Sequence, residues 1–148
     1  MVIDYLQPQN ITQGDIARKM GTNSSGTIVY QITDTLNYYI SGDPYNHVLI
    51  TELSFTSGLV YSIDNGYPVI CQVQTSELPI YDGHTSGHYV VATGYYIAQY
   101  NQNAALDERT VYYNDPNYRT AFYGSHSCTI NEMKNAIDAK NDFYIMGG

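Results

Sequence analysis

One histidine and one aspartate, at the ends of two β-rich segments, are the side chains best placed for proton transfer. His88 opens an apolar segment that runs to Tyr96, and Asp115 closes a segment that begins at Arg109. If the two segments form an antiparallel hairpin in which Tyr96 pairs with Asp107, His88 lies directly opposite Asp115. Opposed Cβ atoms are about 4.5–5.5 Å apart, so the carboxylate can accept a hydrogen bond from one imidazole nitrogen. That bond fixes the tautomer and leaves the other nitrogen free as a general base, whereas a shift of one residue would separate the pair.

The two cysteines, Cys71 and Cys128, are the available thiol nucleophiles. Cys71 alternates with Val69 and Val73 in an expected strand, which predicts a buried, apolar role. Cys128 directly precedes an expected helix N-cap, where the pKa of a thiol can be lowered. A disulfide between the two cysteines is the remaining alternative, although two cysteines do not make a disulfide scaffold.

The four histidines do not predict a metal site. His84 and His88 are four residues apart, but they lie on a loop and a strand rather than on one helix face. His47 and His126 are isolated in the sequence, and we expect them to be structural or solvated. The sequence therefore predicts neither a metal ion nor another cofactor.

Helical patterns dominate the first half of the chain and strand patterns the second. Helices are expected over residues 1–6, 12–20, 27–39, 53–63 and 129–137, and capping boxes open the second and the last of these. Strands are expected over residues 47–51, 67–74, 88–96, 109–114, 118–123 and 143–146, with a polar connection at 98–107. No repeat or linker interrupts the pattern. We therefore predict a single α+β domain over residues 1–148, with N-terminal helices followed by an antiparallel β-sheet.

The composition excludes several kinds of partner. A net charge of −8 and a pI of about 4.6 argue against nucleic acid and anionic membrane surfaces, because both require basic patches. All apolar runs are shorter than the ~20 residues that span a membrane, and no signal peptide is visible at the start. The chain has 17 tyrosines, no tryptophan and only 6 lysines and arginines, which is typical of an extracellular protein.

The segment from Gly87 to Tyr95, followed by a strand that ends in Asn-Asp-Pro, resembles the C-terminal half of a known enzyme family. That family is the double-glycine (bacteriocin-processing) cysteine peptidases of bacteria, which have a papain-like fold. Residues 66–70 resemble the strand before the histidine loop, and residues 11–17 and 26–27 resemble the helical half. The resemblance implies that His88 is a general base, that Asp115 orients it, and that the substrate is a peptide or protein with small residues at the cleavage point.

The resemblance also implies two residues that no position of this chain matches. In the family, a glutamine supplies an oxyanion-hole donor and a cysteine follows it at the start of the first long helix. Residues 1–6 resemble the later part of that helix, so we expect the domain to be N-terminally incomplete and the chain to be inactive. Three explanations remain open: a lost N-terminal segment, a natural pseudoenzyme or partner-dependent half, or a non-homologous cysteine such as Cys71.

Two other functions compete with a peptidase. A pseudopeptidase would keep the peptide groove and lack the thiol. An extracellular glycan-binding module would instead expose tyrosines that cluster away from His88. The sequence leaves the natural substrate and the oligomeric state open.

Overall fold

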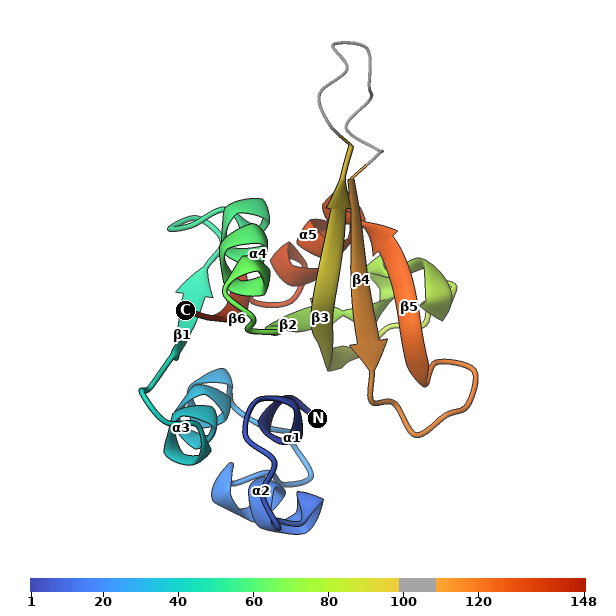
Figure 1. Ribbon diagram of the computed structural model, residues 1–148. Coiled ribbons are helices and arrows are strands. Elements are labelled where there is room, and N and C mark those ends of the chain that lie inside the picture. Colours follow the sequence, from blue (N-terminus) through green and yellow to red (C-terminus); the bar gives the residue numbers. More distant parts are fainter. Residues whose placement is uncertain (99–108) are drawn as a thin grey trace.

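A six-stranded antiparallel sheet forms the centre of the computed structural model, which describes residues 1–98 and 109–148 (Figure 1). Its strands lie in the order β1-β6-β2-β3-β4-β5. Their bounds are β1 (Tyr45–Leu49), β2 (Val69–Gln74), β3 (Gly87–Ile97), β4 (Arg109–Asp115), β5 (Gly124–Thr129) and β6 (Phe143–Gly147). The central strand β2 pairs with β3 on one side and with β6 on the other.

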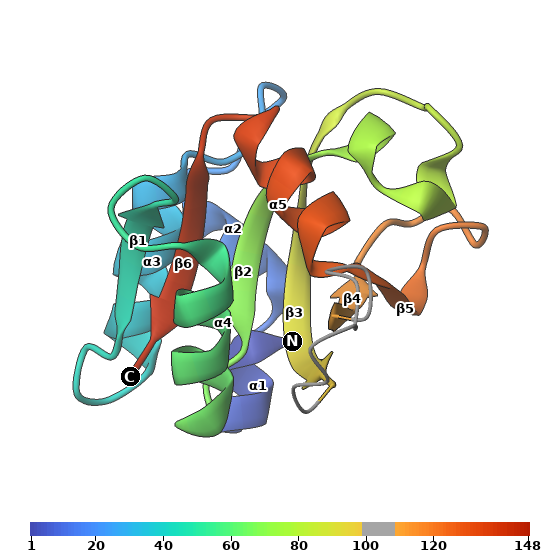
Figure 2. The same ribbon diagram turned by 90° about the horizontal axis from the view of Figure 1, so that it is seen from above.

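Helices cover both faces of the sheet (Figure 2). On one face lie α1 (Val2–Leu6), α2 (Gln13–Lys19) and α3 (Val29–Tyr39); on the other lie α4 (Phe55–Asp64) and α5 (Ile130–Asp138). Two short 3-10 turns, η1 (Thr75–Glu77) and η2 (Pro79–Tyr81), connect β2 to β3. None of the helices in the described part of the chain is long and apolar enough to cross a lipid bilayer.

The residues of β2 alternate between two hydrophobic cores, because successive side chains of a strand point to opposite faces. Val69, Cys71 and Val73 pack with residues of α4 and α5, whereas Ile70 packs with residues of α1 and α3. Burial on both faces explains why β2 has a continuous run of buried residues. The same alternation in β3 directs His88 to the α4–α5 side, because His88 pairs with Val73.

Most of the predicted elements are present, including both capping boxes. Thr12 with Asp15 caps α2, and Thr129 with Glu132 caps α5. The greater part of the predicted connection at 98–107, from residue 99 onward, lies outside the described residues.

The strand predicted at 118–123 is wrong, and the edge strand β5 follows it instead. The segment folds as turns because the Asn117 side chain accepts a hydrogen bond from the Arg119 amide, at 3.0 Å, and the Arg119 carbonyl accepts two more from Phe122 and Tyr123. β5 is mostly polar, and only its Cys128 is buried. Its pairing with β4, rather than its own pattern, makes it a strand.

A β-bulge sets the register of β3 against β4. Ala92 pairs with Tyr113 and Gly94 pairs with Tyr112, so Thr93 is an extra residue on β3. Tyr96 pairs with Thr110, and the predicted pairing of Tyr96 is therefore wrong. Its expected partner, residue 107, lies outside the described residues.

Candidate active site

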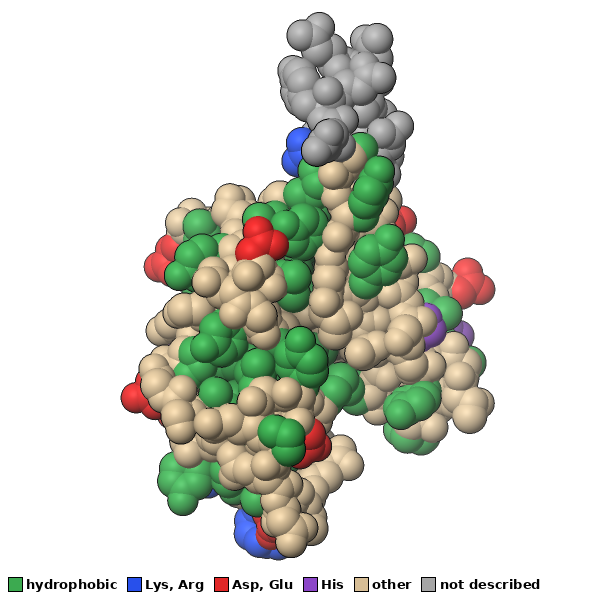
Figure 3. Space-filling model, in the orientation of Figure 1, with side chains coloured by type: hydrophobic (Ala, Val, Ile, Leu, Met, Phe, Trp, Pro, Cys, Tyr) green, Lys and Arg blue, Asp and Glu red, His purple; other side chains and the backbone are tan. Residues whose placement is uncertain are grey.

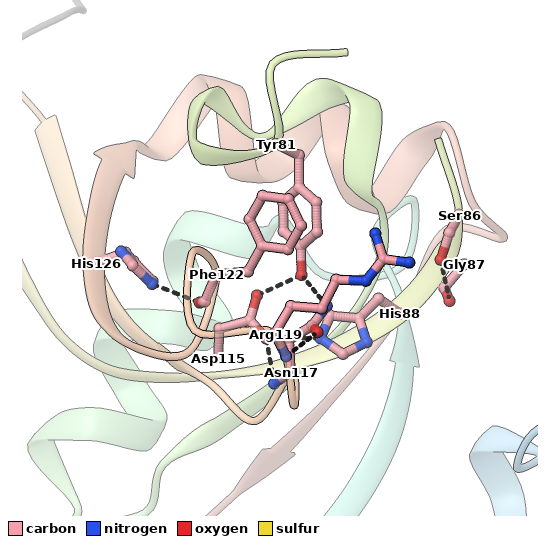
Figure 4. Close-up of polar contacts among 9 residues, drawn as sticks. All are labelled: Tyr81, Ser86, Gly87, His88, Asp115, Asn117, Arg119, Phe122 and His126. Carbon is pink, nitrogen blue, oxygen red and sulfur yellow. Dashed lines mark hydrogen bonds and ion pairs between the residues drawn. The ribbon is translucent and has the colours of Figure 1, made fainter. Parts of the chain in front are cut away.

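His88 and Asp115 form a hydrogen-bonded pair at the end of the sheet where β3 begins and β4 ends (Figure 4). The distance between His88 Nε2 and Asp115 Oδ1 is 2.7 Å. The histidine side chain is 22% exposed and the aspartate side chain is fully buried. The two residues that the sequence singled out are thus in contact, with the histidine on the solvent side of the pair.

The predicted register placed His88 directly opposite Asp115, and this register is wrong. The pair forms nevertheless. Val91 pairs with Asn114, so continuation of the ladder places Asp115 opposite Val90. A difference of two positions keeps both side chains on the same face of the sheet. His88 and Asp115 are diagonal neighbours, at a backbone separation of about 7–8 Å that the imidazole can span.

Two further donors hold the Asp115 carboxylate. The Tyr81 hydroxyl donates to Oδ2 at 2.7 Å, and the Asn117 amide donates to Oδ1 at 2.8 Å. The Asn117 side-chain Nδ2 in turn donates to the Tyr81 hydroxyl at 3.1 Å. Figure 4 shows these groups converging on the carboxylate from the η2 turn and from the loop after β4.

Hydrogen bonding keeps Asp115 ionised. Burial acts to raise the pKa of Asp115, but hydrogen bonds from His88, Tyr81 and the Asn117 amide outweigh burial and lower the pKa below its ordinary value. An ionised carboxylate only accepts, so Nε2 of His88 must carry the hydrogen of this bond. In the neutral imidazole, Nδ1 is then the unprotonated nitrogen, and it has no partner among the residues that the structure describes.

The Tyr81 ring is fixed on both sides. It stacks on Phe122 with ring centroids 4.3 Å apart, and it meets the edge of His88 at 6.2 Å. Burial, followed by the hydrogen bond to Asp115, raises the pKa of Tyr81, so its hydroxyl remains a donor. The aromatic packing therefore orients the hydroxyl that supports the carboxylate.

Sequence reasoning missed both Tyr81 and Asn117. The turn sequence after β4 contained a usable signal, because an aspartate often bonds the amide two residues further on, as Asp115 does with Asn117. No comparable signal existed for Tyr81. It is 34 residues from Asp115 in the chain and comes from a segment that the sequence predicts only as a loop.

Neither cysteine belongs to this site. Cys71 is completely buried, as predicted, and burial raises the pKa of its thiol. Cys128 is also buried, and burial, with a smaller contribution from Glu132, raises the pKa of this thiol to about 12. The idea that the helix N-terminus lowers the pKa of Cys128 is therefore wrong. Both thiols are free, so the disulfide alternative is wrong as well.

Two of the other three histidines, His126 and His47, have structural surroundings. His126 bonds the Phe122 carbonyl at 2.6 Å, and the His47 ring packs edge-on against Tyr30 with centroids 4.1 Å apart. His84 is exposed in the loop before β3. Among residues 1–98 and 109–148, no three His, Cys, Asp or Glu side chains gather as a metal ion would require.

Comparison with known proteins gives a family and a fold. The model of the peptidase C39-like family matches residues 1–141. A crystal structure from Bacillus anthracis, described as that of a candidate C39-like peptidase, is similar with a TM-score of 0.65 and 13% identity. The match covers 99% of this chain and 84% of the other, and at this identity it concerns the fold alone. No curated protein matches the sequence. The likeness confirms the predicted α+β fold, with N-terminal helices and an antiparallel sheet.

Proposed function

The chain belongs to the peptidase C39-like family, and we propose that it acts on peptides through a half-site in which His88 is the general base and Asp115 orients it. One observation carries the proposal: His88 Nε2 bonds a carboxylate that is fully buried and that two further donors hold. A carboxylate fixed in this way holds the imidazole in one tautomer and one orientation.

Nδ1 of His88 is the atom that would take a proton. In a cysteine peptidase, the imidazole removes the thiol proton, the thiolate attacks the peptide carbonyl carbon, and the imidazolium returns the proton to the leaving amine. Because Nε2 is committed to Asp115, the proton must move through Nδ1.

In a cysteine peptidase, the group that His88 deprotonates is a thiol. Cys71 and Cys128 cannot supply it, since both sulfurs are buried and burial raises both pKa values. Residues 1–148 alone would therefore bind peptides without hydrolysing them, as a pseudopeptidase does. Hydrolysis would require a thiol from outside these residues to reach Nδ1 of His88.

We further propose that the chain belongs to a bacterial protein that is secreted or attached to the cell surface. The tyrosine-rich, lysine-poor composition supports the extracellular location. Residues 1–148 would form a single domain of that protein.

One observation favours glycan binding as a second candidate. Tyr96 and Tyr112 lie on the sheet face opposite Asp115, at 56% and 48% exposure, and the pairing of β3 with β4 makes them diagonal neighbours. Sugar rings stack on exposed aromatic faces of this kind. Glycan binding that Tyr112→Ala abolishes and His88→Ala leaves intact would favour this candidate.

A library of random synthetic peptides tests the main proposal. The purified chain and its His88→Ala variant are incubated with random synthetic peptides, and mass spectrometry records which peptides are retained and which are cut. We expect retention of a subset without cleavage. Cleavage that His88→Ala abolishes would support the base and overturn the claim of inactivity. If no peptide is retained or cut, the proposed function is wrong.

A further inference from the structure

A surface cavity of about 310 Å³ lies beside the His88–Asp115 pair. One wall comes from the loop between β2 and β3 and includes Tyr81 and Ser86; the other comes from the loop after β4 and includes Asn117 and Arg119. Tyr81 and Asn117 also hold the Asp115 carboxylate. The cavity therefore shares its walls with the half-site, and its size is at the lower end of the roughly 300–1,000 Å³ of ligand pockets.

The charge of the cavity is opposite to that of the chain as a whole. The sequence has 14 acidic and 6 basic residues, and Figure 3 shows how few basic side chains appear on one face of the molecule. The described residues that line the cavity nevertheless include Arg119 and His84 and no aspartate or glutamate.

Arg119 has no carboxylate partner among the described residues, unlike two other basic residues of the chain. Arg18 pairs with Asp15, and Lys134 pairs with Asp138. The Asp115 carboxylate is already occupied by its three donors and is fully buried. The Arg119 guanidinium lies over the Tyr118 ring, 5.9 Å from its centroid. An arginine without a carboxylate partner at a cavity wall presents a fork of N–H donors that fits a carboxylate.

The surroundings of Arg119 position its side chain and add a second donor. Its backbone amide bonds the Asn117 side chain at 3.0 Å, which fixes the start of the side chain. Figure 4 shows the guanidinium reaching toward the Ser86–Gly87 end of the site. The Thr85 hydroxyl, on the opposite wall, accepts a hydrogen bond from Gln74 and can still donate one into the cavity.

We propose that this cavity binds a carboxylate of the bound peptide, through Arg119 and the Thr85 hydroxyl. The carboxylate is either an acidic side chain next to the position where His88 acts or the C-terminus of the peptide. This inference rests on the proposed function, and it makes peptides with an acidic group the preferred ligands. Physiological salt screens the exposed negative charges of the chain that lie farther than about 8 Å from the cavity.

Matched peptide libraries separate the two sources of the carboxylate. Short acetylated libraries with neutral random positions carry glutamate or glutamine at one fixed position, each with an amidated C-terminus. A third library carries glutamine and a free C-terminal carboxylate. Retention by the full chain is compared for wild type, Arg119→Gln and Arg119→Lys. Arg109→Gln is the matched control, since it removes the same charge at the far end of β4.

We expect the wild type to retain one of the two carboxylate libraries about 10-fold better than the amidated glutamine library, as a charge-assisted hydrogen bond allows. Arg119→Gln should abolish this preference, Arg119→Lys should keep part of it, and Arg109→Gln should leave it unchanged. Preference for the glutamate library identifies an acidic side chain, and preference for the free terminus identifies the C-terminus.

Two results would overturn the inference, and only the second would also contradict the proposed function. If all three libraries bind equally, or if Arg119→Gln keeps the preference, the carboxylate site is wrong and the peptide-binding function stands. If no library binds to the wild type, the proposed function fails together with the site. Unchanged circular dichroism of Arg119→Gln verifies that the exposed substitution leaves the fold intact.

Discussion

Replacing Tyr81 by phenylalanine removes one hydrogen bond from Asp115 and leaves the aromatic packing in place. The hydroxyl donates to Oδ2 of a fully buried carboxylate at 2.7 Å, and the ring stacks on Phe122. A hydrogen bond to a charged group contributes about 1.5–3 kcal/mol to folding stability. Since phenylalanine leaves no cavity, we expect Tyr81→Phe to lower the free energy of unfolding by about 2 kcal/mol, or the melting temperature by about 4–8 °C.

Tyr113→Phe is the matched control for this substitution. Tyr113 is 1% exposed on β4, two residues from Asp115, and its hydroxyl is buried without a hydrogen-bond partner in the described part of the chain. Removing an unpaired buried hydroxyl is neutral or stabilising. Urea denaturation of both variants measures the difference, and equal effects of the two substitutions would refute the assignment of the Tyr81 hydroxyl to Asp115.

The pH dependence of Tyr81→Phe gives a second readout. The folded pKa of Asp115 is lowered, so its contribution to stability is complete above the unfolded carboxyl pKa of about 3.9 and is lost as the pH falls through the folded value. The stability difference between wild type and variant should therefore be constant near neutral pH and shrink in acid. A difference that does not change in acid would mean that the hydroxyl does not act through the ionised carboxylate.

Other substitutions and labels test the packing and the buried thiols. Gly58→Ala should destabilise the protein by about 1–3 kcal/mol, because the new Cβ would lie 2.7 Å from Tyr144 Cε2. Gly14→Ala, on the open face of α2, should instead stabilise it by about 0.5–1 kcal/mol. Thermal denaturation compares the two variants, and equal effects would contradict the close contact between Gly58 and Tyr144. Iodoacetamide should leave Cys71 and Cys128 unmodified in the folded chain and modify both in denaturant, because burial raises both pKa values; rapid labelling of the folded chain would show an accessible nucleophile.

Local patterns were sufficient to predict most helices and the contact between His88 and Asp115. The capping boxes at Thr12 and Thr129 depend on residues three positions apart, so they can be predicted without knowing the tertiary structure. His88 and Asp115 were predictable as a pair because His88 lies at the start of β3 and Asp115 ends β4, the next strand along the chain. Their exact register mattered less than parity, since a shift by an even number of residues keeps both side chains on one face.

Features that depend on partners far apart in the chain could not be predicted from the sequence. The bulge at Thr93 moves the register of β3 on β4, although the neighbouring Gly94 was a usable warning of such an irregularity. β5 exists because β4 offers it a free edge. Tyr81 contacts Asp115 only because the antiparallel arrangement of β2, β3 and β4 places the η2 turn next to the end of β4. Apart from Gly94, none of these features leaves a local pattern in the sequence.

The tautomer of His88 shows whether Asp115 orients the imidazole. Nitrogen-15 NMR of the imidazole, at a pH where the ring is neutral, distinguishes a protonated nitrogen from a bare one at each ring position. We expect a hydrogen on Nε2 and a bare Nδ1 in the wild type, and loss of this fixed preference in Asp115→Ala. A hydrogen on Nδ1, or the same mixture of tautomers in wild type and Asp115→Ala, would contradict the assignment of His88 as a base that Asp115 orients.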